Sequence, residues 1–253
     1  LLDEINAVTS KRELPALIGK LQRVGVDVFF GYGEQQDLKD ATKQIALIQQ
    51  DGLGLPEKDY YLRTGAKDVT IRQQYVAHVA KMLTLAGSTP EQAQKDADSI
   101  LAFETALAKG SLSVTDMRDP EKTSHLQPIA AFEAGIPGIN FGAFEEAIHS
   151  PHISEINNAT PQFFPVLVEQ IRSNDLETLK AYMRYHLLTA VAGRLPSQFD
   201  QENFDFYGRK LRGQPEQSPR WKRCSNSVDA ALGEALGKVY VQHYFAGDSK
   251  ERM

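Results

Sequence analysis

Apolar residues recur every three or four positions along most of the chain, which is the spacing of one face of an α-helix. In the first such segment the apolar face consists of Leu14, Leu17, Ile18 and Leu21. Ser10 and Glu13 precede it with the spacing of a capping box, in which each side chain binds the other residue's main chain. A second helical pattern runs from about Ile71 to a stop signal at Gly87.

The clearest helix start is Thr89 followed by Pro90, because Thr is a good N-cap and Pro suits the first helical turn. We expect Gln92 to complete a capping box there and Gly110 to end the helix. The residues predicted to be buried on this helix are Ala93, Ala97, Ile100, Leu101 and Leu107. Later helices are predicted to start at Thr160, at Asn174 with Glu177 (ending near Leu195), at Gln198 (ending near Leu211) and at Pro219.

One region has a period of two instead. In "VDVFFGY" the residues Val26, Val28, Phe30 and Tyr32 alternate with others, and "KQIALIQ" is a second β-rich run. The pattern predicts one small antiparallel hairpin over about 26–48, too small to supply a sheet-based core. The predicted fold class is therefore mainly α, a helical lobe with one hairpin, and 1–253 is expected to form one helical domain.

Composition excludes few classes of protein. The 253 residues carry a net charge of −5, which gives no reason to expect a nucleic-acid partner. No apolar run approaches the roughly 20 residues that span a bilayer, so no membrane contact is predicted. Cys224 is the single cysteine, which excludes an intrachain disulfide and a cysteine-based zinc site, and we expect a small buried side chain there.

The residues show no catalytic motif. His149 and His152 are three apart, but Pro151 breaks the helix that would place both rings on one face, so solvated loop histidines are expected. His78 and His186 lie within helices and are expected to be satisfied by neighbours. His125 and His243 have no companions, and neither His-Glu-x-x-His nor Gly-x-Ser-x-Gly occurs. The glycines of "GLGL" (52–55) indicate a turn, because the spacing and lysine of a phosphate loop are missing.

One segment is strongly basic. The basic region (209–223) contains Arg209, Lys210, Arg212, Arg220, Lys222 and Arg223, with Trp221 and Tyr207 close by. Such a region could bind an acidic partner, and the simpler interpretation is a solvated turn between two helices.

Three segments resemble the neprilysin family of zinc metallopeptidases. "DGLGLPEKDYYL" (51–62) resembles the family's Leu-Gly-Leu-Pro-x-x-Asp-Tyr-Tyr stretch. The second resemblance is to a helix and an Arg-(Asn/Asp)-Pro element, carried here by Glu104, Leu107, Ala108, Arg118, Asp119 and Pro120. The third is to Trp-(Arg/Lys)-Arg-Cys, Gly-(Arg/Lys)-(Leu/Val)-Tyr-Val and Phe-Ala-Gly-x-Ser-Lys elements, carried by Trp221, Arg223, Cys224, Gly237, Tyr240, Val241 and 245–247.

The resemblance implies a non-catalytic N-terminal lobe. In the family this lobe caps a chamber over the active site and admits oligopeptides, while zinc is bound by a C-terminal catalytic domain. The chain is therefore expected to be truncated at both ends, with the catalytic domain following Met253. A helix suggested by Asp248 and Glu251 would begin at Ser249.

By the same resemblance, this chain should be inactive alone and bind no zinc, with no catalytic, cofactor-binding or metal residues of its own. Its expected partners are the catalytic domain and oligopeptide substrates, and bacterial members with leaders are periplasmic or extracellular. The alternative is a stand-alone helical module that binds an acidic partner through the basic region.

Overall fold

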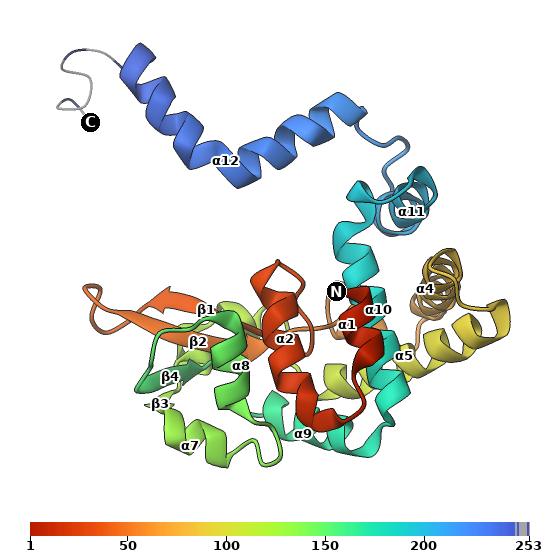
Figure 1. Ribbon diagram of the computed structural model, residues 1–253, viewed down its shortest axis with the longest axis horizontal. Helices are drawn as coiled ribbons and strands as arrows, with labels where there is room; N and C mark the ends of the chain where they lie inside the picture. Colours follow the sequence, from red (N-terminus) through yellow and green to blue (C-terminus); the bar gives the residue numbers. More distant parts are fainter. Residues whose placement is uncertain (246, 248–251, 253) are drawn as a thin grey trace. The chain divides into compact units, whose positions relative to one another are not determined.

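The structure is a computed structural model that describes residues 1–245, 247 and 252 (Figure 1). The chain divides into two compact units, one formed by residues 1–206 and one that starts at Tyr207. Helices dominate, so the predicted mainly α class is confirmed. The single helical domain predicted over 1–253 stays a prediction, and the helix predicted from Ser249 lies outside the described residues.

The first unit is built mainly from helices. Its α-helices are α1 (Leu2–Ala7), α2 (Leu14–Arg23), α3 (Asp59–Leu62), α4 (Ala66–Leu85), α5 (Pro90–Gly110), α6 (Pro120–Thr123), α7 (Ile129–Ala134), α8 (Phe141–Ile148), α9 (Phe163–Ser173), α10 (Leu176–Val191) and α11 (Ser197–Asn203). Short 3-10 helices are η1 (Lys11–Glu13), η2 (Asp116–Arg118) and η3 (Ala192–Arg194). A π-helix, η4 (Phe204–Leu211), follows α11, and α12 (Arg220–Tyr244) belongs to the second unit.

Helix α5 lies at the centre of the helical part and packs against α3, α4, α9 and α10. Four of its five predicted core residues are buried, and Leu101 is half-buried. Phe103 and Glu104 are buried next to it instead. The helical period thus gave the correct face, and Leu101 lies at its margin.

The predicted hairpin is present within a larger sheet. Strands β1 (Phe30–Gln36) and β2 (Gln44–Gln50) pair antiparallel, with Phe30 opposite Gln50. Strand β4 (Glu155–Asn158) pairs parallel to β2, and β3 (Leu126–Pro128) pairs antiparallel to β4, giving the order β1-β2-β4-β3. The sequence missed β3 and β4 because strands of three and four residues are too short to show alternation.

The first strand starts later than predicted. Val26 and Val28 precede it, because Phe29 has a left-handed backbone (φ 66°) that interrupts an extended chain. The Phe29 ring packs against Phe103 and Tyr182 in the core, which fixes this conformation.

The helix starts are partly as predicted. Ser10 and Glu13 form the full capping box, at the start of η1, which leads into α2. Thr89 Oγ1 accepts a hydrogen bond from the Gln92 main-chain N–H at 3.2 Å. The Gln92 side chain binds Asp96 instead of returning to Thr89, so only half of the predicted box forms.

Two later helix starts differ from the prediction. Thr160 does not cap α9, because its hydroxyl accepts the Gln50 N–H at 2.7 Å and the helix begins at Phe163. Asp175, not Asn174, caps α10 by accepting the Thr178 N–H at 2.7 Å. This hydrogen bond stabilises the carboxylate and lowers the pKa of Asp175.

Candidate functional site

The histidines do not assemble into a site. Among the described residues there is no group of three or more His, Cys, Asp and Glu side chains that could hold a metal ion. His78 is buried, with its Nδ1 2.9 Å from Glu202 Oε1. His186 Nε2 lies 2.9 Å from Glu104 Oε1. Both histidines therefore have polar partners inside the fold, as predicted.

The other histidines are on the surface. His149 is the left-handed residue that ends α8 (φ 61°), and His152 lies in the exposed loop beyond it. His125 and His243 are exposed. The prediction that this chain holds no catalytic, cofactor-binding or metal residue stays a prediction.

Glu104 on α5 is the centre of a buried polar cluster. Its side chain is fully buried, and its carboxylate accepts hydrogen bonds from Tyr61 Oη at 2.8 Å and from Tyr75 Oη at 2.8 and 3.0 Å. With His186, these residues form the Glu104 cluster, which joins α3, α4, α5 and α10. A buried carboxylate is tolerated only when such partners replace water, so the cluster fixes four helices in one arrangement.

The glycine-rich turn packs directly against this cluster. Gly52 has a positive φ of 83°, which favours glycine, and its carbonyl accepts a hydrogen bond from Tyr182 Oη at 2.8 Å. A Cβ atom on Gly54 would clash with Tyr75 Oη. The turn predicted at 52–55 is confirmed, and it is a close-packed structural element.

Tyr182 on α10 connects the turn to the start of β1. Its hydroxyl donates to Gly52 and accepts the Phe29 N–H at 3.0 Å. Burial raises the pKa of Tyr182 well above its ordinary value, and the negative charge of Glu104 adds to the shift.

Two segments that carry the family resemblance thus meet in space. Tyr61 lies 43 residues from Glu104 in sequence, and His186 lies 82 residues from it. Sequence reasoning identified both segments but could not pair them, because no local pattern reports a contact across such separations.

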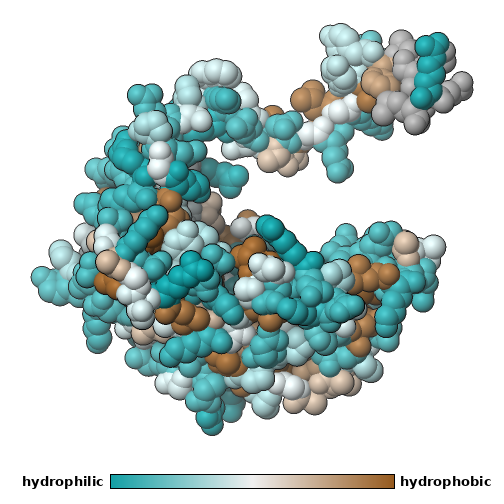
Figure 2. Space-filling model, turned by 180° about the vertical axis from the view of Figure 1, so that it is seen from behind, coloured by the Kyte–Doolittle hydropathy of each residue, from teal (hydrophilic) through white to brown (hydrophobic). Residues whose placement is uncertain are grey.

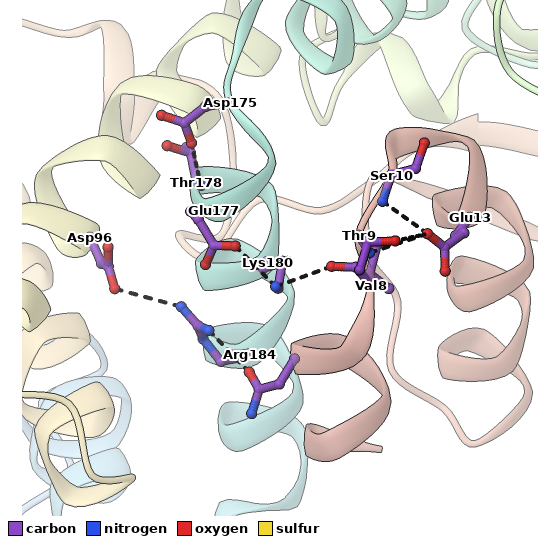
Figure 3. A network of polar contacts seen from close by, with 11 residues as sticks. Val8, Thr9, Ser10, Glu13, Asp96, Asp175, Glu177, Thr178, Lys180 and Arg184 are labelled. Atoms are coloured by element: carbon purple, nitrogen blue, oxygen red, sulfur yellow. Dashed lines mark hydrogen bonds and ion pairs between the residues drawn. The ribbon is translucent and has the colours of Figure 1, made fainter.

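Helix α10 also holds the N-terminal segment in place (Figure 3). Lys180 Nζ donates to the carbonyl of Val8 at 3.2 Å. Arg184 donates to Asn6 Oδ1 at 3.1 Å and lies 3.8 Å from Asp96 Oδ2 on α5. These polar contacts connect α1, α5 and α10.

The basic region is largely exposed, which agrees with a solvated segment. Its exposed basic side chains are Arg209, Lys210, Arg212, Arg220 and Lys222, and Arg223 is half-buried. Trp221 is 70% exposed. Cys224 is also exposed, so the predicted burial is wrong. It lies on α12, none of whose described residues is buried.

An apolar stripe runs along α12. It comprises Trp221, Val228, Leu232, Leu236 and Val239, each between 50% and 70% exposed. At 100° per residue these five positions fall within an arc of about 80° on one helix face. Glu234 lies on the opposite side of the helix together with Val241, which is 47% exposed, and Lys238 lies about 120° from the centre of the stripe. Apolar side chains are visible at the surface along this helix in Figure 2. We name these five residues the α12 stripe and regard it as a candidate docking surface, because contiguous exposed apolar residues mark interaction sites.

No helix among the described residues has both the length and the apolar character needed to cross a membrane.

Known proteins resemble the chain over nearly its whole length. The N-terminal model of peptidase family M13 matches residues 1–253. Rat (Rattus norvegicus) endothelin-converting enzyme 1 is 30% identical over 230 residues, which are 88% of this chain and 30% of that protein.

Solved structures give the same result. The Mycobacterium tuberculosis zinc metalloprotease Zmp1 in its open state matches 99% of this chain and 39% of its own, with a TM-score of 0.94 and 31% identity. PepO from Lactobacillus rhamnosis matches 99% of this chain and 40% of its own with a TM-score of 0.82; at 19% identity it supports the fold alone.

The chain therefore spans about 30% of the length of the curated relative. The family model covers the whole chain, and the open-state structure matches 99% of it. The chain belongs to peptidase family M13 and corresponds to the N-terminal part of its members.

Proposed function

We propose that this chain is the non-catalytic lobe of a zinc metallopeptidase, here called the parent peptidase. The supporting observation is the match of the whole chain to the N-terminal model of the family, together with the 0.94 TM-score against a zinc metalloprotease. By analogy with the family, the proposal assigns zinc and peptide hydrolysis to a catalytic domain that follows this lobe in the parent peptidase.

The proposed role is to cap the chamber over the active site and restrict access to oligopeptides. A steric filter needs a wall that keeps its shape. The first unit has suitable construction, because a buried carboxylate joins four helices and the glycines of the 52–55 turn leave no space for larger side chains.

The proposed partner of the α12 stripe is the catalytic domain of the parent peptidase. Fully burying one large apolar side chain stabilises a complex by about 1.5–3 kcal/mol before binding costs are subtracted. Five such side chains in an arc of one helix could therefore support a permanent interface. By family analogy, we propose that the parent peptidase acts in the periplasm or outside the cell.

Reading the parent coding sequence tests this proposal. The proposal expects a His-Glu-x-x-His motif several hundred residues after Met253, with a later Glu-x-x-x-Asp. A stop codon soon after Met253 would contradict it.

A second candidate function is a stand-alone helical module that binds an acidic partner. It is supported by the exposed side chains of the basic region. Such binding would weaken steeply as salt is raised, because binding of the basic side chains releases counterions condensed on the acidic partner. The test compares the salt concentration at which the unchanged chain and a triple variant, Arg209→Gln with Lys210→Gln and Arg212→Gln, elute from a heparin column. Elution of the unchanged chain at no higher salt than the variant would exclude this alternative.

A further inference from the structure

Strand β1 forms one edge of the sheet, and its outer side is open. The strand order places β1 at the end, and among the described strands it pairs with β2 alone. Gly33, Glu34 and Gln36 are exposed, and Tyr32 is half-buried. Figure 1 shows the hairpin of β1 and β2 extending past the helices that cover the sheet.

The register determines which main-chain groups point outward. The Asp37 N–H donates to the carbonyl of Lys43 at 2.9 Å, across from it in the hairpin. Because hydrogen-bonded pairs alternate with open pairs in an antiparallel ladder, positions 31, 33 and 35 bond to β2. The N–H and C=O groups of Tyr32, Glu34 and Gln36 then face away from β2.

A side-chain contact at the start of the strand agrees with this assignment. The carbonyl of Phe30 accepts a hydrogen bond from Gln22 Nε2, so it also points away from β2. The free edge therefore begins at Tyr32. In the part of the chain that the structure describes, no other segment forms a hydrogen bond with the main chain of Tyr32, Glu34 or Gln36.

The opposite edge of the sheet is protected. Strand β3 has three residues, ends in Pro128 and leads at once into α7. Short length and proline are the usual means of blocking an edge. Strand β1 has seven residues and no proline.

One face beside the β1 edge can accept side chains. A Cβ atom on Gly33 would meet no heavy atom within 4 Å. Gly33 is paired with Leu47, and Gln35 with Ile45, so Leu47 and Ile45 lie on the same face. Both are half-buried. The space at Gly33 thus adjoins an apolar surface.

We propose that the outer edge of β1 binds an extended peptide as an added strand. Outward donors and acceptors at a spacing of two residues match an extended main chain, and the space at Gly33 fits an apolar side chain of the peptide. This inference deepens the proposed function, because it assigns part of substrate binding to this lobe. It depends on the proposed function in one respect, namely that the bound peptide is a substrate of the parent peptidase.

A second copy of the chain is a poorer occupant of this edge. An antiparallel pair of β1 edges centred on residue 34 would place the two Glu34 side chains opposite each other. Like charges in that position are destabilising. A peptide with basic or neutral flanking residues avoids this repulsion.

The test uses the 253-residue chain and a labelled probe, acetyl-Lys-Thr-Val-Thr-Val-Thr-Lys-amide, in a fluorescence anisotropy titration. Glu34→Pro removes one outward N–H and leaves the β1–β2 ladder intact, whereas Glu34→Ala keeps the N–H and removes the charge. We expect Glu34→Pro to weaken binding at least about tenfold and Glu34→Ala less than about threefold. Absence of probe binding to the unchanged chain, or equal losses in the two variants, would overturn the proposal.

A second measurement does not depend on the fold of a variant. Two probes carry N-methyl groups on alternate residues, so that each blocks one edge of the extended peptide. We expect one of them to lose binding and the other to keep it. Equal binding of the two methylated probes would overturn the proposal. Self-association of the unchanged chain that is lost in Glu34→Pro would also overturn it, because a second copy would then occupy the edge. The reading of the parent coding sequence is separate, so failure of the proposed function and failure of this inference are distinguishable.

Discussion

Helices α5 and α12 have similar lengths, 21 and 25 residues, and both carry apolar residues at helical spacing. Helix α5 buries nine residues, and its neighbours include α4, α9 and α10. Helix α12 buries none of its described residues, and its stripe is exposed to solvent. The difference shows that an apolar stripe specifies a helix face but not the partner of that face. For α5 the partners are within the first unit, and for α12 we propose the catalytic domain of the parent peptidase.

The largest loss of stability should follow a substitution in the Glu104 cluster on α5. Glu104→Ala would leave Tyr61, Tyr75 and His186 without their buried acceptor. We expect the free energy of unfolding of this chain, measured in urea, to fall by about 3–5 kcal/mol. Lys95→Ala, at an exposed position on the same helix, is the control and should change it by less than about 0.5 kcal/mol. Similar losses in both variants would contradict the role of the cluster.

Replacing a glycine by alanine should lower stability in the 52–55 turn and raise it in α12. Gly54→Ala drives a Cβ atom into Tyr75 Oη and should lower the free energy of unfolding by about 1–3 kcal/mol. Gly237→Ala, in α12, meets no atom within 4 Å and should increase helix stability by about 0.5–1 kcal/mol. Thermal unfolding of both variants, followed by circular dichroism, checks the two signs. A stabilising Gly54→Ala would show that the turn is not tightly packed.

The Tyr182 hydroxyl should make stability depend on alkaline pH. The pKa of Tyr182 is raised in the folded chain above the value of about 10 that tyrosine has in the unfolded chain. The contribution of this hydroxyl to the free energy of unfolding is therefore complete below about pH 10. It is lost as pH rises further, because Tyr182 ionises first in the unfolded chain. Tyr182→Phe should cost about 1–3 kcal/mol at pH 8, since the Phe29 N–H and the Gly52 carbonyl lose their partner. Urea unfolding of both proteins should show this cost shrinking above about pH 10. A constant difference at all pH values would refute the assignment.

The smallest effect on stability is expected on α12. Leu232→Asp should change the free energy of unfolding of this chain by no more than about 0.5 kcal/mol, because Leu232 is 58% exposed. The same variant should reduce concentration-dependent self-association in light scattering, since it interrupts the stripe. Lys238→Asp, about 120° around α12 from the centre of the stripe, is the control and should leave self-association unchanged.

Local signals in the sequence predicted the elements well where they were strong. Thr89 with Pro90 and Gly110 predicted the bounds of α5. The alternation of residues from Val26 to Tyr32 predicted the hairpin, whose first strand begins at Phe30. Strands β3 and β4 were missed because both are very short and because β4 pairs with β2, and β3 with β4, across distant parts of the sequence. Caps at Thr160 and Asn174 were wrong because the hydroxyl of Thr160 is used by Gln50 and because Asp175 is the better acceptor.

The sites were less predictable than the elements. The sequence identified the Glu104 and Tyr61 segments by resemblance, but their contact depends on the packing of α3 against α5. The α12 stripe follows an amphipathic pattern, but such a pattern does not show whether the helix is covered. The burial predicted for Cys224 was wrong for this reason, because cysteine is usually buried but α12 is exposed. The open edge of β1 requires the register, which only the three-dimensional structure supplies.

Hydrogen exchange of α12 amides, in this chain and in the parent peptidase, tests the central claim most directly. Helix α5 serves as an internal reference that should be protected in both. We expect α12 to exchange at least about a hundredfold more slowly in the parent peptidase, because a docked helix opens less often than an exposed one. Equal exchange of α12 in the two proteins, with α5 protected in both, would contradict the claim that the stripe is a docking surface for the catalytic domain.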